Sequence, residues 1–186
     1  MSEHLNWRER KTNAMNRLHA RSSGLGRAAT GFVAPPEPRT IGRVARGRQI
    51  VAGNFLFAGH LVEAPELDLW DLPAPDDAFT SELHGFGWLD DLAALGDFAA
   101  YERARAWTFD WIDRFGRGTG PGWTPDLTGR RVLRWISNSV ALLNGQDDVR
   151  RAIFFTALTR QTTFLARRWS AAEPGLPRFE ALVGRL

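Results

Sequence analysis

The sequence predicts an all-α protein, namely a partial α/α toroid built of antiparallel helical hairpins, preceded by a basic N-terminal arm and a short β-ribbon. Two observations favour this class. From Thr80 onward, apolar residues recur at steps of three and four, which is the period of an amphipathic helix. The first and second expected helices, and the third and fourth, are joined by only one to three residues, and such short connections force the two helices of each pair to run antiparallel. No repeat with a period of about 33 or 34 residues is visible, which disfavours a solenoid.

The first four expected helices each begin near a residue whose side chain can cap a helix N-terminus, and three of them end before a glycine or an asparagine. The expected ranges are 81–95, 97–115, 128–143 and 147–169, followed by a last helix from residue 178. Their apolar stripes predict which side chains fill the space between two hairpins. These are Phe98, Trp107, Trp111, Ile136, Val140, Ile153 and Phe154.

The chain divides into three parts. Residues 1–40 are expected to form a basic arm with a weakly amphipathic helix and a proline-rich linker, because proline disfavours helical geometry. Residues 41–78 are expected to be an extended segment with a short β-ribbon, since β-branched and aromatic residues there are interrupted by glycines. Residues 79–186 are expected to form the incomplete toroid, truncated at the C-terminus.

Charge is distributed unevenly although the net charge is only +3. The segments 1–50, 61–97 and 98–186 carry about +7, −10 and +6. The chain contains no cysteine, which excludes disulfides, thiolate nucleophiles and cysteine metal sites. It also lacks an apolar run of about 18 residues and the apolar core of a signal peptide. We therefore expect a cytoplasmic location, with a periplasmic one left open.

A glycine- and proline-rich loop presents Trp123 just before a helix that carries Arg130, Arg131 and Arg134. Aromatic faces beside guanidinium groups are typical of proteins that hold chains of acidic sugars, because arginine pairs bidentately with planar anions. Arg130 and Arg134 share one helix face, whereas Arg131 is turned about 100° away. The alternative is a solvated arginine face in which Arg134 pairs with Asp110 or Asp113.

Several segments in order resemble the N-terminal toroid of heparinase II/III-type polysaccharide lyases, over roughly residues 40–186. These segments are 81–92 (SELHGFGWLDDL), 107–112 (WTFDWI), Gly122-Trp123 and 130–136 (RRVLRWI). The resemblance implies a bacterial carbon–oxygen lyase that cleaves uronic-acid polysaccharides of the glycosaminoglycan kind by β-elimination. It also implies that the catalytic groups, the rest of the toroid and a β-sandwich lie beyond this chain. No catalytic residue is therefore assigned, and the substrate-binding candidates are Trp123, Arg130, Arg134, Asn138, His84 and Trp88.

The implied partner is an acidic polysaccharide or oligosaccharide, and neither a membrane nor a cofactor is expected. His60 and His84 lack the spacing of metal ligands, so no metal site is expected. Nucleic acid is a disfavoured partner, since no helix-turn-helix, zinc or RNA-binding signature accompanies the basic arm. The alternative function is a non-catalytic helical scaffold or a polyanion-binding module.

Overall fold

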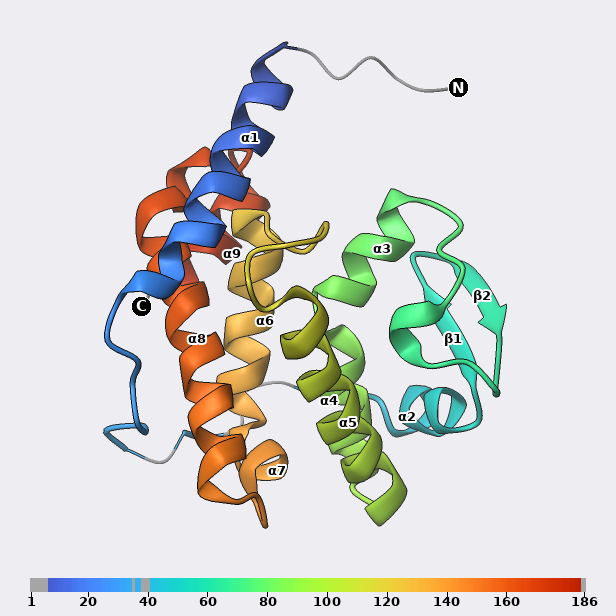
Figure 1. Ribbon diagram of the computed structural model, residues 1–186. Coiled ribbons are helices and arrows are strands. Elements are labelled where there is room, and N and C mark those ends of the chain that lie inside the picture. Colours follow the sequence, from blue (N-terminus) through green and yellow to red (C-terminus); the bar gives the residue numbers. More distant parts are fainter. Residues whose placement is uncertain (1–6, 35, 38–40, 185–186) are drawn as a thin grey trace.

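A computed structural model describes residues 7–34, 36–37 and 41–184. The protein is mostly helical, with one two-stranded sheet at its edge (Figure 1), so the expected all-α class with a short β-ribbon is confirmed. Strands β1 (Asn54–Phe57) and β2 (His60–Glu63) pair antiparallel. The described helices are α1 (Trp7–Ser22), α2 (Val44–Val51), α3 (Asp77–His84), α4 (Gly87–Leu95), α5 (Phe98–Phe115), α6 (Pro125–Ser137), α7 (Ser139–Leu143), α8 (Asp148–Arg168) and α9 (Leu176–Val183).

The two longest helices begin where the sequence predicts them, because their N-terminal amides have side-chain acceptors. Asp97 accepts a hydrogen bond from the Ala100 amide at 2.8 Å at the start of α5. Asp147 does the same for the Arg150 amide at 2.7 Å at the start of α8. Each carboxylate satisfies one of the amides that a helix N-terminus leaves unpaired.

The prediction of a single helix over residues 81–95 is wrong, because the chain bends between α3 and α4. Phe86 adopts a left-handed conformation with φ of 62°, which is uncommon for a residue with a side chain. Its ring is fully buried and packs 4.7 Å from the Trp88 ring, centre to centre. At the bend, the Leu89 amide donates to the carbonyl of Phe86. The Gly85 carbonyl is thereby left open for a side-chain donor.

The helix expected over residues 128–143 differs in the same way. It begins earlier, at Pro125, whose ring suits the first turn of a helix. It also breaks at Asn138, which leaves helical geometry and separates α6 from α7. Val140, which its spacing predicts to be buried, lies in the short helix after this break and is 62% exposed.

Helix α2 lies in a segment that the sequence predicts to be extended. It packs against α4, and two glycines allow the close approach. A Cβ atom on Gly42 would lie 1.8 Å from the Asp90 carbonyl oxygen, and one on Gly47 would lie 2.4 Å from that of Asp91. Larger residues at these positions would push the two helices apart.

Aromatic rings dominate the core between the helices. Trp107 and Trp111 are buried as predicted, and so is Phe154, which stacks on the buried Trp135. Two further predictions of burial are wrong. Phe98 is 79% exposed, because it is the first residue of α5 and lies beyond the packed part of that helix. Ile153 is 38% exposed, because α8 and α5 leave a groove at that point.

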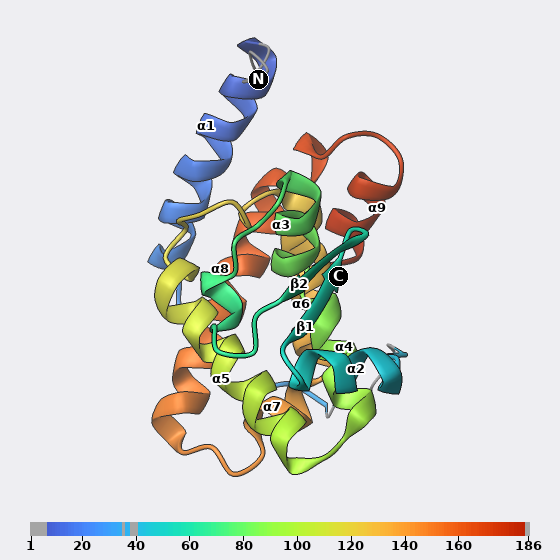
Figure 2. The same ribbon diagram turned by 90° about the vertical axis from the view of Figure 1, so that its right-hand side faces the viewer.

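Helix α1 lies along α8, and its first turns project beyond the rest of the protein (Figure 2). The Arg168 side chain donates to Asn16 Oδ1 at 2.8 Å, which ties the two helices together across most of the sequence. A membrane-spanning helix is not found in the part of the chain that the structure describes.

Candidate functional site

Four arginines from two distant segments surround one polar cavity of about 270 Å³. Arg43 and Arg46 come from the start of α2, and Arg130 and Arg134 come from α6. We call this cavity the arginine cleft. Its floor is formed by the start of α4, and its lining also includes the carboxylates Glu82, Asp90 and Asp91.

Asp91 holds the α2 side of the arginine cleft. Its Oδ1 accepts a hydrogen bond from the Arg43 backbone amide at 2.7 Å, and its Oδ2 lies 3.7 Å from Arg46 Nε. Arg46 also donates through Nη2 to the Leu56 carbonyl at 2.5 Å, which connects α2 to strand β1. Burial raises the pKa of Asp91 above its usual range, while the Arg43 amide and the Arg46 charge act in the opposite direction.

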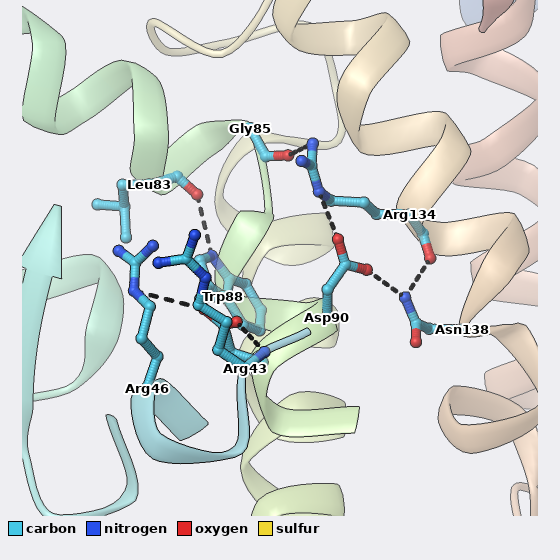
Figure 3. A network of polar contacts seen from close by, with 9 residues as sticks. Arg43, Arg46, Leu83, Gly85, Trp88, Asp90, Arg134 and Asn138 are labelled. Carbon is cyan, nitrogen blue, oxygen red and sulfur yellow. Dashed lines mark hydrogen bonds and ion pairs between the residues drawn. The ribbon is translucent and has the colours of Figure 1, made fainter. Parts of the chain in front are cut away.

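Asp90 holds the α6 side. Its Oδ2 accepts from Arg134 Nε at 2.9 Å, and its Oδ1 accepts from Asn138 Nδ2 at 2.9 Å (Figure 3). Arg134 also donates through Nη1 to the Gly85 carbonyl at 2.9 Å, the acceptor that the bend between α3 and α4 leaves open. The left-handed Phe86 therefore helps to place a cationic side chain at the cleft.

The arginines of the cleft are compensated to different degrees. Arg134 pairs with Asp90, and Arg130 Nε donates to Glu180 at 2.8 Å. Arg46 has only the long pair with Asp91. Within the described residues, the side chain of Arg43 makes neither a hydrogen bond nor an ion pair, although its charge acts on Asp91 through space. The α2 side of the cleft therefore offers guanidinium donors that the protein itself does not use.

Guanidinium groups with free donors recognise planar anions, since two parallel N–H bonds match the two oxygens of a carboxylate. Figure 3 shows the ends of Arg43 and Arg46 pointing the same way, beside Trp88. A carboxylate could bind to this pair from solvent, because Arg43 is exposed. In the described part of the chain, no three His, Asp or Glu side chains gather as a metal site.

Three of the residues expected to bind a substrate line this cleft, namely Arg130, Arg134 and Trp88. The Trp88 ring is 1% exposed, so it forms the cleft floor without presenting a free face. Asn138 lies just behind, where it bonds to Asp90 and lines a neighbouring cavity. Arg134 pairs with Asp90, and not with Asp110 or Asp113 as the alternative interpretation supposed.

The other two candidates, His84 and Trp123, lie in the core. Trp123 is 3% exposed and donates through Nε1 to the Phe115 carbonyl, so neither ring face is open to a sugar. His84 accepts from Trp111 Nε1 at 3.0 Å, and burial, with a smaller contribution from Arg131, lowers its pKa to about 3. Burial also lowers the pKa of Arg131 to about 9. Helix geometry predicts that Arg131 points away from the face of Arg130 and Arg134, and its side chain is indeed buried in the core.

Arg43, Arg46 and Asp91 were missed by sequence reasoning. The signal that could have found the first two is the pair of glycines that brackets them, Gly42 and Gly47. This spacing allows a helix to approach another backbone closely, but the β-branched and aromatic residues that follow, interrupted by glycines, favoured an extended segment. Adjacent Asp90 and Asp91 point to different neighbours, which only the packing of two helices on α4 reveals.

Comparison with known proteins gives a similarity to FtsZ-localized protein C of Caulobacter vibrioides (strain NA1000 / CB15N). The two sequences are 32% identical over 145 residues, which covers 77% of this chain and 25% of that protein. The chain therefore spans about a quarter of the length of this curated relative. No protein-family profile matches the chain. No solved structure matches it either.

These findings correct the function expected from the sequence. The assignment to heparinase II/III-type polysaccharide lyases is wrong, because no such family matches and the relative that does match is named for its localisation with FtsZ. The expected lyase reaction and the expected acidic polysaccharide partner are wrong for the same reason. The short aromatic motifs behind the resemblance instead form the packed core around Phe86 and Trp111.

Proposed function

We propose that this chain is a helical protein-binding module that acts with the FtsZ-containing cell-division machinery. The observation that carries the proposal is the 32% identity to FtsZ-localized protein C over 145 residues. A module built from helical pairs suits this role, because it offers rigid surfaces between helices for another protein. A partial α/α toroid remains our proposal for the arrangement of these pairs.

The arginine cleft is the surface that we assign to the partner, and its ligand is an acidic segment of a protein. Arg43 supplies an uncompensated cation, and Arg46 is held only by a long ion pair. A partner carboxylate would add the missing counter-charge without breaking the bonds of Arg134 or Arg130. Charge pairs of this kind set the specificity and the association rate of an interface.

Co-sedimentation with GTP-assembled filaments of FtsZ, taken from the organism that encodes this chain, tests the proposal. We expect the purified chain to pellet with the filaments and the double variant Arg43→Glu/Arg46→Glu to remain in the supernatant. Arg48→Glu is the matched control, because Arg48 lies on the same helix and is exposed but does not line the cleft. We expect this variant to pellet like the unmodified chain.

Two outcomes would contradict different parts of the proposal. If the unmodified chain does not pellet with FtsZ filaments at low salt, direct binding to FtsZ is wrong. If the double variant pellets as well as the Arg48→Glu control, FtsZ binding stands but the assignment of the arginine cleft is wrong. Binding should also weaken as the salt concentration rises, because exposed charge pairs are screened.

A further inference from the structure

A second surface lies between α5 and α8, away from the arginine cleft. The two helices run in the same general direction, with α6 behind them (Figure 1). They leave a groove of about 660 Å³ between them. Its walls include Ile112 on α5 and the apolar residues Val149, Ala152 and Ile153 on α8. Val149 is 67% exposed, although the apolar period of α8 marks it as a residue for a packed interface.

The two ends of this groove carry opposite charge. At one end, Arg160 donates to the Gly116 carbonyl at 3.0 Å, and Arg117 lines the same end together with one carboxylate, Asp113. Asp148 lies at the other end. The rise per residue of an α-helix puts it about 18 Å from Arg160 along the axis of α8. Neither Arg117 nor Asp148 forms an ion pair with any residue that the structure describes. The groove therefore combines an apolar middle with a net positive charge at the end of Arg117, Arg160 and Asp113 and a negative charge at the end of Asp148.

This pattern is self-complementary. When two copies pack their grooves together around a two-fold axis, their α8 helices run antiparallel. Asp148 of each copy then lies opposite Arg117 of the other, and the two Ile153 side chains meet near the axis. We propose that the α5–α8 groove is a homodimer interface whose occupant is a second copy of this chain.

The area of the α5–α8 surface indicates how tightly two copies are expected to associate. A surface about 18 Å long and two helices wide offers each copy roughly 400 Å², by the dimensions of an α-helix. The total of roughly 800 Å² lies below the size of stable specific interfaces. The dimer is therefore weak, and the monomer and dimer exchange as the concentration changes.

Analytical ultracentrifugation of the full chain over a concentration series, up to about 1 mM where even weak association is detectable, tests this inference. We expect the mean mass to rise from one copy to two. Ile153→Arg should abolish the rise, because it places two like charges together at the axis. Val140→Arg is the matched control, since Val140 is equally apolar and 62% exposed but lies outside the groove.

An exchange of two charges distinguishes a specific interface from nonspecific hydrophobic association. It does not depend on the result for Ile153→Arg. Arg117→Asp and Asp148→Arg should each weaken the dimer about tenfold, because each places like charges opposite one another. The double variant Arg117→Asp/Asp148→Arg should restore it. A wild-type chain that stays monomeric throughout the series, a dimer that survives Ile153→Arg, or a double variant no better than the single ones would overturn the proposal.

Discussion

The guanidinium carbon of Arg131 lies 4.0 Å from the centre of the Trp111 ring, in the middle of the core. No carboxylate among the described residues hydrogen-bonds to this fully buried side chain. Its donors go to neutral acceptors, namely Gln161 Oε1 at 2.6 Å, the Gly122 carbonyl at 3.0 Å and the His84 carbonyl at 3.1 Å. A buried cation thus joins α6 to α8, to the end of α3 and to the loop before α6.

Arg131→Met should destabilise the protein by about 3–5 kcal/mol, because it leaves several buried acceptors without donors at about 1–3 kcal/mol each. Urea denaturation followed by tryptophan fluorescence measures this free energy. Arg130→Met is the matched control one residue earlier, and it should cost less than about 1 kcal/mol because it removes only a part-exposed ion pair. A loss for Arg131→Met no larger than that of the control would contradict the structural role.

His84 should make the protein sensitive to acid. The folded pKa is about 3 and the ordinary value is 6.5, so below pH 6.5 the unfolded chain binds a proton that the folded chain does not. The free energy of unfolding is therefore highest above pH 6.5. It decreases as the pH falls toward 3, by up to about 1.4 kcal/mol per pH unit. His84→Asn can still accept from Trp111 and should flatten this slope, whereas exposed His60→Asn should retain it. Urea denaturation at several pH values gives the slopes, and equal slopes in both variants would rule out this assignment.

Asp90→Asn should increase the affinity of the arginine cleft for acidic peptides, because it removes the carboxylate that compensates Arg134. We expect binding of a fluorescent hexaglutamate peptide to tighten by about three- to tenfold, the effect of one nearby charge in partly exposed surroundings. Asp110→Asn is the control, since it removes a carboxylate from Arg114 on another helix. Equal affinities in the two variants, measured by fluorescence anisotropy, would show that the peptide does not enter the cleft.

Gly42→Ala should destabilise the contact between α2 and α4, because the added methyl group would collide with the Asp90 backbone. The collision involves a helix backbone that cannot move aside, so we expect a loss of about 1–3 kcal/mol. Gly87→Ala adds the same methyl group in α4 where nothing lies within 4 Å, and it should be neutral or stabilising. Thermal unfolding of both variants provides the comparison. A Gly42→Ala protein as stable as Gly87→Ala would argue against the close approach of the two helices.

The sequence predicts much of the helical framework, because local signals determine it. Asp97 and Asp147 mark the starts of α5 and α8, and the stripe through Trp107 and Trp111 identifies a buried face. The bend at Phe86 could not be predicted, since a buried aromatic ring at positive φ depends on the rings packed around it. Periodicity likewise cannot tell whether Ile153 packs within its own chain or faces a groove.

The sequence predicts only one side of the arginine cleft, for a related reason. Arg130 and Arg134 share a helix face that spacing identifies, but the residues opposite them lie about ninety positions earlier along the chain. Only the folded packing of α2 on α4 brings Arg43 and Arg46 to the same cavity. The aromatic residues near the arginines fill the core, and a sequence pattern alone does not distinguish a stacking platform from a packed ring.

The hydrogen bond between Asn16 and Arg168 has a consequence for the order of events during synthesis. The two residues are 152 positions apart, so α1 leaves the ribosome long before its docking surface on α8 exists. Contacts with such large sequence separation form late, because the entropy of closing the intervening loop opposes them. Helix α1 is therefore available to chaperones or to other nascent chains until the C-terminal helices have been translated.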